Sequence, residues 1–368
     1  MKSTLVKIGA GFILGAVTIG GIATAANNDA AGVQACVDKK TQALYLSSNG
    51  KCSGTRTLIA LGGPTIDVKS IAALVTPAVV SIKVTTSTGS GTGSGSIYKT
   101  SADSSFIITN NHVVESAATG GTIEIELVNG DTLPATIVGR DSAYDIAVLK
   151  VEKGNLPTIT VGNSSAISVG DPVVAIGSPL GLASTVTSGI VSAKNRPVTT
   201  GTVGAESYVN AIQTDAAINP GNSGGALLDS YGRIIGVNSA IATLSSGSTS
   251  GSIGLGFSIP INEAKRVIDE LIATGKSTRP LLGVYFDANF TGVGALISKL
   301  SPGEAADKAG IPVGSIIKSI DGLKIADQVG AIVRIRSYAP STTVTVVVEL
   351  PTGGTQSFKV VLGSAPSN

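Results

Sequence analysis

The stretch TDAAINPGNSGG, residues 214–225, decides how the rest of the sequence is interpreted. It sets Ser223 between Gly221 and a pair of glycines. A nucleophilic serine needs a tight turn that exposes its hydroxyl and directs backbone N–H groups toward a developing oxyanion, and flanking glycines permit such a turn. The same composition also fits a polar surface loop. The stretch therefore predicts a nucleophilic Ser223 only if suitable partners lie elsewhere in the chain.

Two further motifs supply those partners. His112 is the only histidine and ends a β-branched run, and Asp145 directly precedes the apolar segment IAVL. Each alone is weak, because a single histidine is often structural and aspartate is common in turns. The order His112, Asp145, Ser223 is that of the chymotrypsin arrangement, and differs from that of subtilisin or the α/β-hydrolases. The spacings of 33 residues (145 − 112) and 78 residues (223 − 145) leave room for the strands of two barrels.

Together these motifs resemble the HtrA/Deg family of trypsin-like serine proteases, of the single-PDZ type. The segments that carry the resemblance are residues 109–114, 145–149, 189–193, 213–225 and 254–260, within a span of about 66–362. The resemblance implies a mainly β fold: a trypsin-like double six-stranded β-barrel over residues 66–275, followed by a PDZ-like α+β domain over residues 280–363. It also implies an active site between the barrels, homotrimers, and unfolded or misfolded proteins as substrates.

The resemblance assigns a role to each residue of the triad. Ser223 attacks the scissile carbonyl, His112 accepts its proton and later returns it, and Asp145 orients the imidazole. The backbone N–H groups of Gly221 and Ser223 bind the oxyanion, with Asn222 holding the backbone between them, and loss of one donor costs about 3 kcal/mol. No cofactor is expected. No metal site is expected either, because the single histidine is committed and no carboxylates have ligand spacing.

The residues before the serine are expected to set the substrate specificity. Ala217 stands six residues ahead of Ser223, near the expected floor of the S1 pocket, and Ile218 follows it. Because no aspartate stands there to pair with arginine or lysine, small or medium aliphatic P1 residues are expected. The expected substrate-binding set is completed by Gly254, Leu255 and Gly256.

The composition agrees with a β-rich chain of more than one domain. A length of 368 residues predicts two or three domains. Short runs of valine, isoleucine and threonine between turn residues are typical of barrels and sandwiches. The net charge of +2, with 14% charged residues and no basic block, argues against a nucleic-acid partner. Helices are predicted at residues 68–74, 263–273 and 327–338, a loop at 85–96, and linkers at 61–64 and 276–280.

Residues 1–25 have the layout of an export signal. Lys2 and Lys7 precede an uncharged apolar run, and Ala-Thr-Ala at residues 23–25 fits a cleavage site. An uncleaved membrane anchor is the alternative, since the run is long enough to span a bilayer. Both interpretations place the rest of the chain outside the cytoplasm, whether secreted, in the cell envelope or anchored facing outward.

Residues 26–65 are expected to form a small segment, hairpin-like over 27–60, followed by a linker, and the segment contains the two cysteines of the chain. Export favours a disulfide between Cys36 and Cys52, whose loop of 16 residues (52 − 36) would contribute about 3 kcal/mol. Two free thiols are the alternative. A zinc site is not expected, because no further cysteine and no histidine lies nearby.

The PDZ-like region carries a candidate peptide site. Leu281, Leu282, Gly283 and Val284 match the loop and strand that receive a C-terminal carboxylate, so C-terminal peptides are expected partners through β-augmentation. Two departures from the family pattern, at Ser315 and at residues 340–341, leave the ligand preference open. A packing domain that binds no peptide is the alternative.

Arg196 is the candidate regulatory residue. It lies in a loop expected at residues 195–206 and matches the arginine that senses the state of the PDZ domain in the family. A solvated loop arginine is the alternative. For the whole chain, a proteolytically weak chaperone or peptide-binding scaffold is the alternative function, followed by an adhesion protein that uses residues 26–65.

Overall fold

The computed structural model of the chain describes residues 33–41, 43–47, 51–61, 66–178, 184–200, 207–239 and 254–367. These residues form two compact units, one ending at Ile66 and the other beginning at Asp67. The predicted export signal at 1–25 lies outside the described residues, as do residues 48–50 of the predicted hairpin-like module. Within the described ranges, no helix is long and apolar enough to cross a membrane.

The N-terminal unit is a small antiparallel sheet of order β2-β1-β3. Its strands are β1 (Val33–Asp38), β2 (Leu44–Leu46) and β3 (Arg56–Leu61). The expected disulfide between Cys36 and Cys52 is present and ties β1 to the segment before β3. The guanidinium of Arg56 also lies over the Tyr45 ring, 3.6 Å from its centroid. With so little apolar area to bury, a unit of this size depends on such cross-links.

The first barrel of the larger unit closes in the order β4-β5-β6-β9-β8-β7. Its strands are β4 (Val79–Thr86), β5 (Gly89–Thr100), β6 (Ser105–Thr109), β7 (Thr122–Glu126), β8 (Thr132–Asp141) and β9 (Ile146–Val151). Helix α2 (Val68–Val75) and a 3-10 turn, η1 (Thr76–Ala78), precede the barrel, and a second such turn, η2 (Glu115–Thr119), precedes β7. The predicted helix at 68–74 is therefore confirmed.

The loop predicted at residues 85–96 is wrong, because β5 pairs with β4 from Gly89 onward. The glycines there serve close packing. A Cβ on Gly93 would lie 2.6 Å from Cγ1 of Val113, and one on Gly95 would lie 2.7 Å from Cγ2 of Ile107. Composition alone cannot separate a flexible glycine-rich loop from a strand whose glycines allow close approach.

The second barrel closes in the order β10-β11-β12-β15-β14-β13. Its strands are β10 (Pro172–Gly177), β11 (Thr185–Thr200), β12 (Ser207–Thr214), β13 (Ala226–Leu228), β14 (Ile234–Ser239) and β15 (Gly256–Pro260). The prediction of two six-stranded barrels is confirmed. The loop predicted at 195–206 is wrong as far as Thr200, since β11 continues to that residue through two register shifts, and residues 201–206 lie outside the described ranges.

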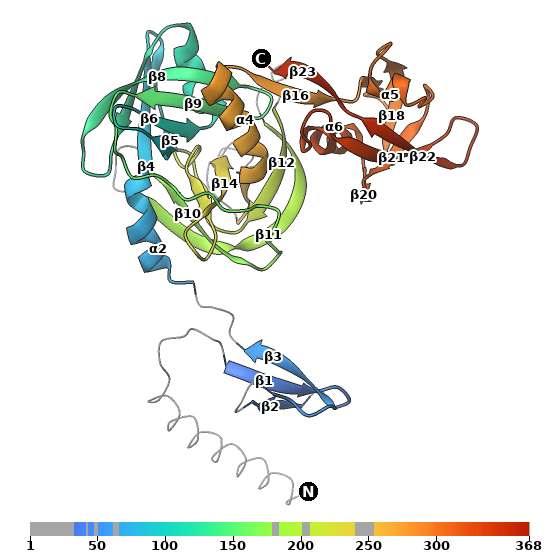
Figure 1. The fold of residues 1–368 in the computed structure, drawn as a ribbon, viewed down its shortest axis with the longest axis horizontal. Coiled ribbons are helices and arrows are strands. Elements are labelled where there is room, and N and C mark those ends of the chain that lie inside the picture. Colours follow the sequence, from blue (N-terminus) through green and yellow to red (C-terminus); the bar gives the residue numbers. More distant parts are fainter. Residues whose placement is uncertain are drawn as a thin grey trace, which may run out of the picture. The chain divides into compact units, whose positions relative to one another are not determined.

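Helix α4 (Ile261–Thr274) packs against strands of both barrels: β8 and β9 of the first, β14 and β15 of the second. Figure 1 shows it lying across the two. Its buried face consists of Ile261, Ala264, Val267, Ile268 and Leu271. The helix ends at Gly275, whose φ of 73° is the left-handed cap expected of glycine. The predicted helix at 263–273 is thus confirmed, and Pro260 stands at its N-terminal cap.

The C-terminal domain is a sheet covered by helices, as expected for a PDZ-like α+β fold. The sheet has the order β17-β18-β19-β21-β22, with β20 paired to β19. The elements are β17 (Val284–Phe286), β18 (Ala295–Leu300), α5 (Ala305–Lys308), β19 (Ile316–Ile320), β20 (Leu323–Lys324), α6 (Gln328–Arg336), β21 (Thr343–Glu349) and β22 (Thr355–Val361). Helix α6 corresponds to the helix predicted at 327–338, and the Asp327 side chain caps it through the Gly330 N–H.

The linker predicted at residues 276–280 is wrong. These residues lie largely in β16 (Ser277–Leu281), which pairs along its full length with β23 (Gly363–Ser367). Lys-Ser-Thr-Arg-Pro has the composition of a linker, and its partner strand is more than eighty residues away in the sequence. Only tertiary structure brings the two strands together.

Candidate active site

His112 and Asp145 lie together at one edge of the first barrel. His112 is in the short helix α3 (Asn111–Val114), just after β6, and Asp145 directly precedes β9. Because β6 and β9 are paired, the two residues meet although they are 33 positions apart. Nδ1 of His112 lies 2.9 and 3.0 Å from the two carboxylate oxygens of Asp145. When Nδ1 donates its proton there, Nε2 of the imidazole is left as an acceptor.

The Asp145 carboxylate is held in this orientation by burial and by its backbone. The residue is 2% exposed and has a φ of 52°, a left-handed conformation that aspartate tolerates better than most residues. Its Oδ1 also accepts the backbone N–H of His112 at 3.0 Å. The Asp145 carbonyl accepts Nδ2 of Asn110 at 3.0 Å. The acid is therefore fixed from both its side chain and its main chain.

The loop that carries Ser223 comes from the second barrel and is docked on the first. The backbone N–H of Ser94, in β5, donates to the Ser223 carbonyl at 2.8 Å. Gly224 leaves no space for a side chain there, because a Cβ would lie 2.1 Å from the Ser94 carbonyl oxygen. The Ser94 carbonyl also accepts the hydroxyl of Thr109, three residues before His112, at 2.7 Å. The loop with the serine is thus held beside the segment with the histidine.

Residues 221–223 form a tight turn. Gly221 has a φ of 96°, which glycine adopts without strain. The Asn222 N–H donates to the Asn219 carbonyl at 2.9 Å within the turn, so Asn222 shapes the backbone and does not offer this N–H to a ligand. The Ser94 hydroxyl donates to the Gly221 carbonyl at 2.6 Å and accepts the Ser178 N–H at 2.8 Å. Sequence reasoning missed Ser94, which stands in the glycine-serine stretch interpreted as a loop.

The expected substrate-binding residues lie at the end of β12 and the start of β15. Ala217 is partly exposed, whereas Ile218 is fully buried in the core of the second barrel. A Cβ on Gly256 would lie 3.0 Å from Cδ1 of Ile218. Ile218 therefore packs beneath Gly256 from inside the barrel and does not present its side chain at the surface. Of the remaining pair, Gly254 is exposed and Leu255 is partly exposed.

A groove of about 230 Å³ lies between β17 and α6 of the C-terminal domain. Its apolar lining comes from Leu281, Leu282, Val284, Phe286, Ile332 and Ile335, with Pro280 and Gly283. The charged residues of the lining are two arginines, Arg279 and Arg336. The four predicted carboxylate-loop residues thus all border this groove, although Leu281 is the last residue of β16.

Arg196 lies in β11, away from any loop described by the structure. Its side chain is exposed, and its Nε donates to Oε1 of Gln213 on the neighbouring strand at 3.2 Å. The structure therefore gives Arg196 a partner within the barrel.

A second cavity, of about 310 Å³, lies between the second barrel and helix α6. Glu263 of α4 borders it and accepts Nδ2 of Asn210 at 2.8 Å. Burial raises the pKa of Glu263 to about 7, against the opposing effects of the Asn210 hydrogen bond and of Arg334 and Arg266.

Nowhere in the described ranges do three or more histidine, cysteine, aspartate or glutamate residues gather as metal ligands.

The comparison with protein families matches residues 93–237 to the trypsin-like peptidase domain. These residues include His112, Asp145 and Ser223 and span parts of both barrels.

Two similar curated proteins are proteases. Serine protease PepD of Mycobacterium tuberculosis is 44% identical over 325 residues, which cover 85% of this chain and 69% of PepD. A probable periplasmic serine endoprotease, DegP-like, of Chlamydia pneumoniae is 43% identical over 60% of this chain, but the match spans only 45% of that protein.

Solved structures of similar fold are also proteases. The HtrA-type protease AlgW, solved with a tripeptide, has a TM-score of 0.62 and 34% identity, covering 82% of this chain and 98% of that one. A serine endoprotease from Yersinia pestis has a TM-score of 0.54 and 33% identity, covering 83% of this chain and all of that one. The identities and coverage extend the similarity beyond the barrels to the C-terminal domain.

Proposed function

The chain belongs to the HtrA/Deg family of trypsin-like serine proteases, and on this premise we propose that it cleaves unfolded or misfolded proteins outside the cytoplasm through an acyl-enzyme. The observation that carries the proposal is the pairing of His112 Nδ1 with the Asp145 carboxylate at 2.9 Å, beside the docked loop of Ser223. That geometry leaves Nε2 to act as a base toward a hydroxyl.

The proposed reaction has two halves. The Ser223 hydroxyl adds to the scissile carbonyl while its proton passes to Nε2 of His112, and the imidazolium then protonates the departing amine, which leaves an ester on Ser223. In the second half, His112 takes a proton from water as the water adds to the ester carbonyl; the imidazolium then protonates the departing Ser223 oxygen, and the acid product is released. Asp145 stabilises the imidazolium in both halves.

The proposed oxyanion hole uses the N–H groups of Gly221 and Ser223. The turn at these residues supports the assignment, because Gly221 adopts a positive φ and the N–H of Asn222 is already bonded within the turn. Donors fixed before the reaction stabilise the developing charge without reorganisation. Asn222 has an indirect role, through the backbone.

The proposed P1 preference is for small or medium aliphatic residues. Ala217 contributes a small, partly exposed side chain, and the fully buried Ile218 supports the wall behind it. A cationic P1 side chain would find no carboxylate at Ala217 to offset its desolvation, whereas an aliphatic side chain gains by leaving water.

The proposed regulator is a C-terminal peptide bound in the groove between β17 and α6. An extended peptide can pair with β17, and its apolar side chains can enter the groove of about 230 Å³. The location outside the cytoplasm is supported by the disulfide of the N-terminal unit and by relatives named periplasmic. By analogy with the family, we also propose assembly as homotrimers.

The test is degradation of unfolded β-casein by the purified full chain beside its Ser223→Ala variant. A matched control is Ser90→Ala, at an exposed position of β5. Cleavage by the parent and by Ser90→Ala but not by Ser223→Ala is expected, with product ends at aliphatic residues by mass spectrometry. Absence of cleavage by all three, with and without peptides ending in valine, would instead support a peptide-binding scaffold.

A further inference from the structure

The catalytic acid is the last residue of a buried turn, residues 141–145, that joins β8 to β9. Asp141, Ala143, Tyr144 and Asp145 are each at most 7% exposed. The turn is closed internally, since Oδ1 of Asp141 accepts the Tyr144 N–H at 3.1 Å. A shift of this turn would carry the Asp145 carboxylate away from His112, because Tyr144 and Asp145 are consecutive in the chain.

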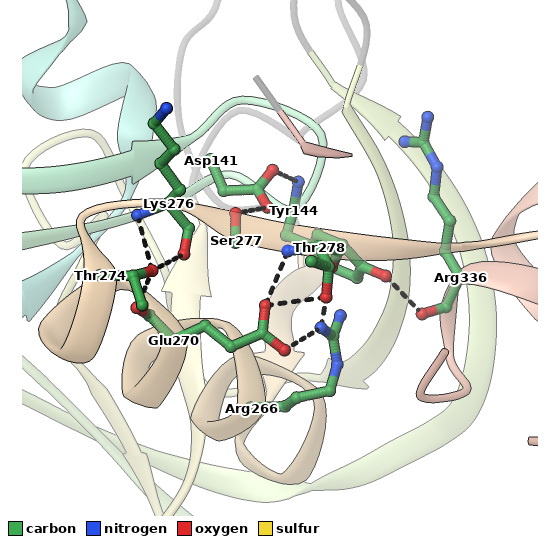
Figure 2. Close-up of polar contacts among 9 residues, drawn as sticks. All are labelled: Asp141, Tyr144, Arg266, Glu270, Thr274, Lys276, Ser277, Thr278 and Arg336. Carbon is green, nitrogen blue, oxygen red and sulfur yellow. Dashed lines mark hydrogen bonds and ion pairs between the residues drawn. The ribbon is translucent and has the colours of Figure 1, made fainter. Parts of the chain in front are cut away.

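Helix α6 of the C-terminal domain holds this turn through its last residue. The Tyr144 hydroxyl donates to the Arg336 carbonyl at 2.8 Å, as Figure 2 shows. In return, Nη1 of Arg336 donates to the Ala143 carbonyl at 3.1 Å. The Arg336 guanidinium also lies over the Tyr208 ring, 4.9 Å from its centroid. One arginine therefore contacts both residues that precede the acid.

The ring of Tyr144 also contacts helix α4, which is bonded in turn to strand β16. The Arg266 guanidinium lies 5.2 Å from the centroid of the Tyr144 ring. Arg266 itself is held by Glu270 at 2.9 Å and by the Thr278 carbonyl at 2.8 Å (Figure 2). A fixed arginine of α4 therefore packs on the Tyr144 ring, while the Arg336 carbonyl accepts the Tyr144 hydroxyl.

The start of the turn is held by β16 and β12. Ser277 donates to Oδ2 of Asp141 at 2.6 Å (Figure 2). At the next residue, the Ser142 carbonyl accepts the Ser207 hydroxyl. The turn is thus attached to β16 and β12 at its start, and to helix α6 through the two bonds that Arg336 makes with Ala143 and Tyr144.

The Tyr144 hydroxyl stays protonated and so remains a hydrogen-bond donor. Burial raises the pKa of its phenol above the ordinary value, with Arg266 opposing, so the hydroxyl keeps its proton throughout the working range of a protease. The Arg336 carbonyl lies at the C-terminus of α6, where a carbonyl has no partner within the helix, and the Tyr144 hydroxyl supplies the donor.

We propose that Tyr144 and Arg336 are positioning residues for the acid Asp145, so that the proteolytic centre requires helix α6 of the C-terminal domain in place. The inference rests on the proposed role of Asp145. Arg336 also borders the peptide groove, so the residue that supports the acid belongs to the same helix that a bound peptide would contact.

The test compares Tyr144→Phe with Tyr338→Phe in the full chain. Both changes remove one phenol hydroxyl at or near the end of α6, but Tyr338 donates to Asp321 inside the C-terminal domain and does not touch the turn. Tyr144→Phe is expected to lower kcat about tenfold with KM nearly unchanged, the size expected for one lost hydrogen bond. Tyr338→Phe is expected to change neither constant.

The pH profile separates positioning from a general loss of stability. A less well placed Asp145 stabilises the His112 imidazolium less, so the acid limb of kcat in Tyr144→Phe should shift to lower pH. Arg336→Lys, which keeps the charge and the helix carbonyl, should fall between parent and Tyr144→Phe. Equal kcat and superimposed pH profiles for parent and Tyr144→Phe would overturn the inference alone, whereas an inactive parent would overturn the proposed function.

Discussion

Gly224 and Thr109 are in such close contact that a Cβ added to Gly224 would lie 2.2 Å from the Thr109 Oγ1. One residue follows Ser223 in the second barrel, and the other ends β6 of the first. The two barrels therefore meet at a point where only glycine fits. The contact fixes the distance between the loop of the serine and the segment of the histidine.

Gly224→Ala is expected to abolish cleavage and to destabilise the larger unit by about 3 kcal/mol or more, since a φ of 85° and a steric clash act together. The comparison is Gly170→Ala, where φ is 94° but nothing lies within 4 Å. That variant should cost only about 1–2 kcal/mol and keep its activity. Urea unfolding and casein cleavage measure both. Equal behaviour of the two variants would show that the contact with Thr109 is unimportant.

Asp145→Asn is expected to lower kcat by roughly 10³–10⁴-fold with little change in stability. The amide oxygen can still accept the backbone N–H of His112, but the amide NH₂ would face Nδ1 of the imidazole. The imidazole would then carry its proton on Nε2, and this nitrogen could not accept a proton from Ser223. Steady-state kinetics on an aliphatic P1 peptide measures the effect. Asp131→Asn, an exposed turn position of the same barrel, is the control and should match the parent. A loss below tenfold at Asp145 would contradict the assigned role.

Removal of the disulfide is expected to affect only the N-terminal unit. Replacing both Cys36 and Cys52 by alanine releases a loop with a sequence separation of 16 and should cost this unit about 3 kcal/mol. The larger unit begins at Asp67 and should keep its unfolding midpoint and its protease activity. Amide hydrogen exchange resolves the two units separately. A loss of protection in the barrels would refute their independence.

Glu263 is expected to make the larger unit less stable as pH rises through the range 4.5 to 7. Burial raises its pKa from 4.5 to about 7, so the folded protein binds a proton that the unfolded chain has already lost. By linkage, the free energy of unfolding falls across that range, by up to about 3 kcal/mol. Glu263→Gln should remove this fall. Urea unfolding at several pH values is the measurement, with the exposed Glu124→Gln as control. Parallel curves for parent and Glu263→Gln would contradict the prediction.

Much of the fold could be predicted from local patterns. The helix at α4 follows from its apolar spacing and from the glycine that caps it, and the strands follow from short β-branched runs. The motifs around His112, Asp145 and Ser223 could likewise be found, because each depends on residues adjacent in the chain. The disulfide was predicted from two cysteines in a chain that begins with the layout of an export signal.

Other features depended on partners far away in the sequence. Residues 89–96 and β16 have the composition of a loop and a linker, yet both are strands because β4 and β23 pair with them. Ser94 gave no sign of its role, since its contact with Gly221 spans 127 positions. Local sequence sets which backbone conformations are low in energy, and so it can identify turns, caps and reactive motifs. Which hydrogen-bonding groups meet is decided when the barrels close and bury those groups, because an unpaired buried group is costly and its partner can come from anywhere in the chain.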